Sequence, residues 1–552
     1  MSNRCRVFFA IACPALLALA FTFPVRTAPQ QSSGAPGPKL VVILVADQMR
    51  FDYLQRYSTR FTGGLKRLMQ NGAWFQSAAY PYLNTVTCPG HSTIGTGTFP
   101  YQHGMVLNTW FDRKTRAATE CTDDEKTTEV SYSHTLTGQS DSGRRLLRPT
   151  LADHIREQAR GRVVALSLKA RSAIGLAGHG GDVVVWFDTR GGFATSTAFT
   201  HTPTAVIQDY VDRNPVNAAY GRQWERLYDP ALYQNKDDNP SEKAPTGWTR
   251  TFPHVIGSKS GKPDGEFYGH WMRSPLSDEY LGKLAATTID AMQLGKRGNV
   301  DFLGVSFSAL DLVGHAFGPN SHEVQDLLAR LDLTIGELLN HLDASVGAEN
   351  YVLAFSADHG VGDIPEDVKG GRYTSAITAG VVDKALEPLL GAGKHVAYTA
   401  YTDIYPEDQA LKRIMKDSEA RKAVLDALRA LPGIVQAYTG DEIARPETRT
   451  SSDPVKRAAG LSYHADRSGD LIIVPRENWL LTASAASHGT LYPYDQHVPV
   501  ILYGAGVRKG NYNAPASPAD IAPSLAALAG IRMSGTDGHA LTEAFAHHSS
   551  TR

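Results

Sequence analysis

The sequence predicts an α/β protein built as a three-layer α/β/α sandwich with a mostly parallel central sheet, extended by insertions or a cap. Two features support this fold class. Apolar runs of strand length recur along the chain, as in strands that are buried on both faces. Helix-periodic segments lie between several of these runs, which is typical of an open α/β sandwich. A chain of 552 residues has room for one large domain with insertions, or for two to four domains.

Six apolar runs are the predicted strands. They cover residues 39–49, 163–168, 183–187, 302–307, 351–355 and 498–503. The first run ends in Asp47, and polar residues follow several of the others. We therefore expect the ends of these strands to present polar side chains.

Helices are predicted from apolar residues at a spacing of three and four. The clearest covers 320–342, with Asn320 as a possible N-cap and Glu323 three residues later. A second is expected at 407–431 before a short strand at 433–438, and a third at 520–530, where it would pack on the edge of the sheet.

Two segments in which predicted strands and helices do not alternate suggest the domain organisation. Residues 200–280 are rich in Tyr, Trp, Asn, Asp and Pro and suit a loop-rich insertion, and residues 381–468 suit a small α+β cap. The catalytic core is then expected in three parts, at 39–199, 281–380 and 469–545.

The N-terminus has the pattern of a secretory signal peptide. Arg4 and Arg6 precede an apolar run at 7–25, and a polar linker at 29–38 follows the small residues that end at position 28. Cleavage would leave a periplasmic or secreted protein with no membrane segment. The alternative is an uncleaved membrane anchor, because about 20 apolar residues can span a bilayer.

The cysteine content and the net charge indicate a possible disulfide and the kind of binding partner. Cys5 and Cys13 lie in the signal region, which leaves Cys88 and Cys121 as an even pair for a disulfide, or as two free thiols. The formal net charge of −1 points to no nucleic acid or other polyanion as a stable partner. Small molecules are the expected partners, and we expect a monomer.

The stretch at 84–97 contains a candidate nucleophile, Thr87, within Thr-Cys-Pro-Gly-His. A threonine hydroxyl attacks nothing at neutral pH unless a base or a metal activates it. Possible activating groups lie at or near the ends of predicted strands, where ligands bind in doubly wound sheets. They are Asp47, Asp311, His315, Asp358, His359 and His488.

The ligand types favour zinc. Imidazole mixed with carboxylate suits zinc, whereas an all-oxygen set would favour magnesium or calcium. Six such residues and one hydroxyl suffice for two ions, which could also hold Thr87 as an alkoxide. His497, nine residues after His488, is an alternative last ligand.

In combination, these motifs resemble the alkaline phosphatase superfamily. The similarity is closest to bacterial periplasmic alkaline phosphatases with a threonine nucleophile, which are related to type I phosphodiesterases and nucleotide pyrophosphatases. It implies an alkaline-phosphatase-like fold and a di-zinc site in which Thr87 forms a phosphothreonine. One zinc would be held by Asp47, Thr87, Asp358 and His359, and the other by Asp311, His315 and His488.

The resemblance also assigns residues that contact the substrate. Asn108 matches an asparagine that contacts a phosphoryl oxygen, and Lys169 and Arg171 match the basic pair of the monoesterase branch. Two extra cations favour the dianionic phosphate monoester over the monoanionic diester. The implied activity is therefore hydrolysis of phosphate monoesters to inorganic phosphate.

The same motifs leave three other functions to compare. A phosphodiesterase or nucleotide pyrophosphatase would use the same metals with an aromatic pocket from the insertion. A catalytically silent binding protein would keep the fold without turnover. Sulfatases of the same superfamily use Cys or Ser in Cys/Ser-x-Pro-x-Arg, and Thr87 with His91 departs from that pattern at both ends.

Overall fold

The computed structural model describes residues 37–133, 138–188 and 190–546. The predicted signal peptide and nearly all of the predicted linker lie outside these ranges. Within them, every helix is too short or too polar to cross a membrane.

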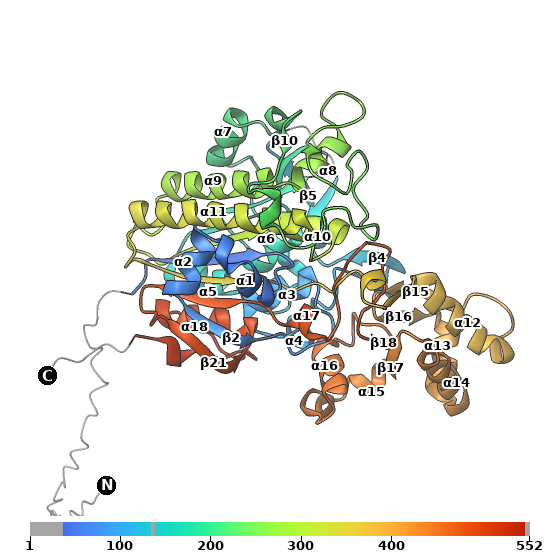
Figure 1. Cartoon of the computed structure of the whole chain (residues 1–552). Coiled ribbons are helices and arrows are strands. Elements are labelled where there is room, and N and C mark those ends of the chain that lie inside the picture. Colours follow the sequence, from blue (N-terminus) through green and yellow to red (C-terminus); the bar gives the residue numbers. More distant parts are fainter. Residues whose placement is uncertain (1–36, 134–137, 189, 547–552) are drawn as a thin grey trace, which may run out of the picture. The chain divides into compact units, whose positions relative to one another are not determined.

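An eleven-stranded mixed sheet forms the centre of the fold (Figure 1). Its five middle strands, β13, β1, β12, β7 and β8, are all parallel, which confirms the predicted fold class. The order across the sheet is β21 (Gly510–Ala516), β2 (Ala73–Ala78), β20 (Val500–Gly504), β13 (Tyr351–Ser356), β1 (Leu40–Ala46), β12 (Asp301–Phe307), β7 (Val163–Ser167), β8 (Val183–Asp188), β9 (Gly192–Ser196), β5 (Asp123–Ser131) and β6 (Gln139–Asp141).

Helices cover both faces of the sheet because the middle strands bury both of their sides. In β1, Leu40, Val42 and Leu44 join one apolar core, and the residues between them join the other. The first core includes α1 (Phe51–Arg56), α2 (Gly64–Asn71), α9 (Pro275–Ala291), α10 (Ala309–Phe317) and α11 (His322–Ser345). The second includes α3 (Thr87–Thr96), α5 (Leu151–Ala159), α6 (Ala170–Ala177) and α18 (Ile521–Ala529).

Three local expectations from the sequence were wrong in detail. The last predicted strand, β20, runs antiparallel to β13, and an apolar run carries no information on direction. The N-cap of α11 is Ser321 rather than Asn320, because the Ser321 side chain accepts a hydrogen bond from the Val324 amide. Helix α18 packs on a face of the sheet and not on its edge, since Ile521 lies in the same core as Val352.

A second, four-stranded sheet lies outside the central one (Figure 1). Its order is β15 (Val396–Ala400), β16 (Asp403–Pro406), β18 (Leu471–Pro475) and β17 (Ile434–Thr439). Helices α12 (Ser375–Leu390), α13 (Asp408–Lys416) and α14 (Ser418–Arg429) share its core. The single helix expected at 407–431 is two helices, because the Asp417 side chain caps the start of α14.

Residues 200–280 contain short elements joined by long loops. These are α7 (Ala205–Arg213), the strand pair β10 (Gln223–Trp224) and β11 (His254–Val255), and α8 (Gly265–Met272). A hairpin of β3 (Thr109–Asp112) and β4 (Ala117–Glu120) follows the segment that contains Asn108. The domain limits expected from the sequence stay predictions.

Candidate active site

The strand order brings the predicted metal ligands to one edge of the sheet. Asp47 directly follows β1, which pairs with β12 on one side and with β13 on the other. Asp311 lies in the first turn of α10, just after β12, and Asp358 lies two residues after β13. Parallel strands end at the same edge, so these three carboxylates converge.

Thr87 is the first residue of α3 and is 1% exposed. Its Oγ1 lies 3.4 Å from Nε2 of His359, the neighbour of Asp358. Helix α3 can approach the loop after β13 this closely only because residue 90 is a glycine. A Cβ at that position would lie 2.1 Å from the carbonyl oxygen of Asp358. The glycine of the Thr-Cys-Pro-Gly-His motif therefore lets the hydroxyl-bearing helix pack against the loop that follows β13.

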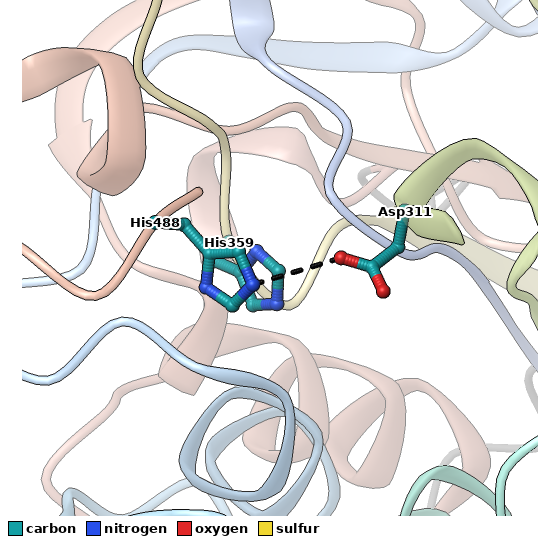
Figure 2. A group of neighbouring side chains, drawn as sticks. All are labelled: Asp311, His359 and His488. Atoms are coloured by element: carbon teal, nitrogen blue, oxygen red, sulfur yellow. Dashed lines mark ion pairs between the residues drawn. The ribbon is translucent and has the colours of Figure 1, made fainter. Parts of the chain in front are cut away.

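Two buried groups of side chains could each hold a metal ion. Asp47, Asp358 and His359 form one group, and Asp311, His359 and His488 form the other, with ligand atoms within 4.8 Å of one another in each group. In Figure 2, His359 and His488 lie against each other with Asp311 facing them, and their rings stack at 3.5 Å. His359 is within reach of both groups, so the two sites are adjacent.

Backbone acceptors orient all three histidines of the cluster. The Nδ1 atoms of His315, His359 and His488 lie 2.9–3.0 Å from the carbonyl oxygens of Ala486, Gly360 and Thr85. Assigned from this network, each Nδ1 carries a proton and donates to the backbone, so Nε2 is the atom that each ring turns toward the cluster. The Nε2 atoms of His315 and His488 lie 3.2 and 3.6 Å from Oδ1 of Asp311, so both Nε2 atoms face this carboxylate.

The cluster contains more buried negative charge than positive charge. Bound metal ions would supply the missing positive charge. Asp47, Asp311 and Asp358 are all buried, and the Lys169 ammonium pairs with Asp47 and Asp311 but not with Asp358. Oδ1 of Asp47 and Oδ2 of Asp358 are buried without a well-aligned hydrogen bond among the described residues, although imidazole nitrogens of His91 and His359 lie 3.2–3.5 Å from them. Such oxygens are costly unless they coordinate a cation, and the mixed oxygen and nitrogen donor set fits two zinc-like ions.

The pKa values of the residues in the cluster reflect the same excess of buried negative charge. Burial and the Asp358 charge raise the pKa of Asp47 to about 7. Burial also acts to raise the pKa of Asp311, but Lys169 and His315 outweigh it and hold that pKa well below its usual value. Burial and the positive charge of His359 lower the pKa of His488 well below its usual value, which keeps this imidazole neutral for ligation.

His497, the alternative last ligand, lies elsewhere. Its ring stacks on Phe51 at 4.0 Å, and its Nε2 contacts the carbonyl oxygen of Gln76 at 2.9 Å. His488 is therefore the histidine that this structure brings to the cluster.

Comparison with known proteins places the chain in a family. The model of the type I phosphodiesterase / nucleotide pyrophosphatase family matches residues 41–497. The chain belongs to this family. Alkaline phosphatase PafA from Elizabethkingia meningoseptica is 31% identical over 533 residues, covering 93% of this chain and 96% of that protein. Alkaline phosphatase PhoV from Synechococcus elongatus is 32% identical over 522 residues, covering 92% of each.

Solved structures agree with this family. The crystal structure of wild-type alkaline phosphatase PafA matches with a TM-score of 0.84 at 31% identity, covering 93% of this chain and all of that one. Murine ectonucleotide pyrophosphatase / phosphodiesterase 5 matches with a TM-score of 0.54 at 14% identity, which shows a shared fold.

Of the predicted substrate residues, Lys169 contacts the metal cluster and Asn108 contacts the residue that follows Thr87. The Lys169 ammonium lies 2.6 Å from Oδ2 of both Asp47 and Asp311. Arg171, in α6, buries its Nε without a hydrogen-bond partner among the described residues. Oδ1 of Asn108 accepts a hydrogen bond of 2.8 Å from the Cys88 amide in the first turn of α3, which leaves its amide nitrogen as a donor.

Sequence reasoning missed two residues that hold the ligands in place. Gln48 donates its side-chain amide to Asp311 at 2.6 Å and its backbone amide to Asp358 at 3.1 Å, in a left-handed conformation with φ of 69°. Gly314 makes room for it, since a Cβ there would lie 1.9 Å from Oε1 of Gln48. The position of Gln48 directly after Asp47 was the only signal for it.

His91 is the second missed residue. Its Nδ1 lies 2.9 Å from the Thr87 carbonyl oxygen and 3.2 Å from Oδ2 of Asp358, and its Nε2 lies 2.8 Å from Oγ of Ser306. It therefore links α3 to a predicted ligand and to β12. The predicted disulfide between Cys88 and Cys121 is present and ties the start of α3 to the end of β4.

Proposed function

We propose that the protein is an exported alkaline phosphatase that uses two zinc ions to hydrolyse phosphate monoesters to inorganic phosphate. The observation that carries the proposal is a threonine hydroxyl next to His359, the residue shared by two buried metal-binding groups, with the Lys169 ammonium in contact with a carboxylate of each. Alkaline phosphatases among its full-length relatives support the same activity.

The chain's own residues supply the binding groups. Asp47, Thr87, Asp358 and His359 would hold one zinc, and Asp311, His315 and His488 the other. Ions bound there would lower the pKa of the Thr87 hydroxyl and stabilise negative charge on the departing oxygen. The cluster lies at the N-terminus of α3, where the helix dipole also favours an anion.

Thr87 is the proposed nucleophile. Its Oγ forms a bond to phosphorus while the bond between phosphorus and the ester oxygen breaks, which yields a phosphothreonine and an alcohol. Water then attacks the phosphorus, phosphate leaves, and the Thr87 hydroxyl is restored. Asn108, Lys169 and Arg171 donate to the phosphoryl oxygens, where positioning and charge provide most of the rate enhancement.

Export rests on two supporting features. The N-terminal 28 residues have the composition of a signal peptide. The disulfide between Cys88 and Cys121 suits an oxidising compartment such as the periplasm or the exterior.

The test is hydrolysis of nitrophenyl phosphate monoester and diester substrates, together with metal analysis of the purified protein. Thr87→Ala is expected to lose monoesterase activity by roughly 10³-fold or more, whereas Thr87→Ser retains part of it. Lys169→Ala and Arg171→Ala should each lower kcat/KM for the monoester by roughly 10–10³-fold, and lower it less for the diester.

Two outcomes would count against the proposal. If diester turnover dominates and both basic-residue variants keep their monoesterase rate, the enzyme is a phosphodiesterase that uses the same site. If Thr87→Ala keeps full activity, or fewer than about one metal ion is bound per chain, the di-zinc mechanism fails.

A further inference from the structure

The turn between β15 and β16, at one edge of the four-stranded sheet, contacts two segments of the candidate active site (Figure 1). It consists of Tyr401 and Thr402. Tyr401 contacts residues on both sides of His488, and Thr402 contacts the segment that leads to Thr87. The proposed mechanism assigns no role to either residue of the turn.

Tyr401 packs against the loop that carries His488. Its hydroxyl lies 3.2 Å from Oγ of Ser487. Its ring lies against Gly489, since a Cβ at that position would be 2.7 Å from Cε1 of Tyr401. The same Cβ would be 3.2 Å from Cγ1 of Val86, the N-cap of α3. The loop is therefore held between Tyr401 and the start of the helix that carries the proposed nucleophile.

Other contacts hold the His488 loop but leave the backbone at Gly489 to be fixed by packing. Nδ1 of His488 lies 2.9 Å from the Thr85 carbonyl oxygen, and the Thr85 hydroxyl donates to the Thr490 carbonyl oxygen at 2.8 Å. Gly489 has a φ of 105°, in a region that glycine enters without a steric penalty. Because glycine is so permissive, its conformation depends on the groups around it, and Tyr401 is one of them.

Tyr401 has a backbone conformation that is unusual for a bulky residue. Its φ is 52°, whereas hairpin turns normally place Gly, Asn or Asp where φ is positive. Such a conformation persists only where the surroundings enforce it. Thr402 is fully buried, and its hydroxyl donates to Oδ1 of Asn84 at 2.8 Å. The Thr402 carbonyl oxygen also accepts from the Ile473 amide at 2.9 Å, so the fold fixes this turn with an aromatic ring where glycine would be less strained.

We propose that Tyr401 is a positioning residue that holds His488 in place for the zinc ion that it would bind together with Asp311 and His315. This inference rests on the proposed function, because binding of two zinc ions is part of that function. The hydroxyl and the ring of Tyr401 restrict the backbone on both sides of this ligand. Groups that orient metal ligands from outside typically contribute about 10–100-fold to metal affinity.

Tyr398 provides a matched comparison for a role in packing alone. Both tyrosines are partly buried against the same apolar cluster, which includes Cys88 and Trp110. The Tyr398 ring lies 5.8 and 6.2 Å from the rings of Phe111 and Tyr405, measured between centroids. Loss of either tyrosine therefore removes packing from one cluster, whereas only loss of Tyr401 removes the contacts with the His488 loop described above.

Zinc titration of the metal-free, full-length protein tests the proposal. Tyr401→Ala should weaken binding of one of the two zinc ions by about 10–100-fold, and Tyr398→Ala should leave both affinities unchanged. Tyr401→Phe keeps the ring and loses only the bond to Ser487, so its affinity should lie between those of Tyr401→Ala and the wild type. Excess zinc should restore the hydrolytic activity that Tyr401→Ala loses at limiting zinc.

Wild-type zinc affinity in Tyr401→Ala overturns the proposal, and so does an equal loss of affinity in Tyr398→Ala. If Tyr401→Ala does not fold, Tyr401→Leu, which keeps apolar volume without the hydroxyl or the flat ring, is measured in the same way. Wild-type affinity in that variant also overturns the proposal. In the wild type, missing monoesterase activity contradicts only the proposed function, whereas missing zinc contradicts both.

Discussion

Removing the Lys169 ammonium should destabilise the metal-free protein far more than the zinc-loaded one. The ammonium lies 2.6 Å from Oδ2 of both Asp47 and Asp311, and the side chain is 7% exposed. Breaking a buried ion pair on one side costs about 3–5 kcal/mol, because it leaves charge without compensation. We expect a loss of this size for Lys169→Met without metal at pH 9, above the pKa of about 7 of Asp47.

Bound metal ions would neutralise the same carboxylates. In zinc-loaded protein the loss for Lys169→Met should therefore fall below about 1.5 kcal/mol, the usual cost of a volume-conserving buried substitution. Urea unfolding after dialysis against a chelator or against zinc measures both values. Lys283→Met, an exposed lysine on α9, is the control, with an expected change below about 0.5 kcal/mol in either state.

An equal free-energy loss for Lys169→Met with and without zinc would show that bound metal does not neutralise these carboxylates. A metal-free loss below about 1 kcal/mol would show that the carboxylates do not depend on this ammonium.

Three further predictions concern the surroundings of the site. Gly90→Ala, whose Cβ would lie 2.1 Å from the Asp358 carbonyl oxygen, should lower kcat/KM by roughly 10²-fold through misplacement of ligands. Asp153→Asn should cost more stability at pH 5.5 than at pH 8.5. The hydrogen bond to Asp153 raises the pKa of His179 in the folded protein. The pair therefore stabilises the fold fully at pH values below the ordinary histidine pKa, and this stabilisation is lost as the pH rises through the raised pKa of His179. Cys88→Ser opens the loop of the disulfide, with a sequence separation of 33, and should cost about 4 kcal/mol in unfolding experiments.

Each of these has a matched comparison. Gly380→Ala, where a Cβ meets no atom within 4 Å, should keep full activity, and an equal loss there would remove the steric argument. His179→Asn should reproduce the pH dependence of Asp153→Asn, and a loss independent of pH in both would show that only the cap of α5 matters. If reduction of wild-type protein leaves its unfolding midpoint unchanged, the disulfide does not stabilise the fold.

Much of the core could be predicted because the middle strands are buried on both faces. That burial leaves continuous apolar runs, and the runs ending at Asp47 and just before Asp358 match β1 and β13. The outer strand β5 is partly exposed, and both β5 and β6 consist largely of polar residues, so they leave no such pattern. The direction of β20 also depends on its partners rather than on its own residues.

The site could be predicted as a set of residue types but not as a geometry. Aspartates and histidines near strand ends indicated a metal centre, and the topology then brought together segments that are hundreds of residues apart. The roles of Gln48 and His91 could not be predicted, because a polar residue near a ligand has no distinctive spacing. Their contacts exist only once α3, β12 and β13 are packed together.

By itself, the sequence determined the fold class, the ligand types and the candidate nucleophile, because burial pattern and side-chain chemistry are properties of local sequence. Only the tertiary structure decided the distances and the charge balance. It put His359 within reach of both groups and made Lys169 the ammonium shared by Asp47 and Asp311. These features depend on low-dielectric contacts between distant segments, which no single stretch of sequence encodes.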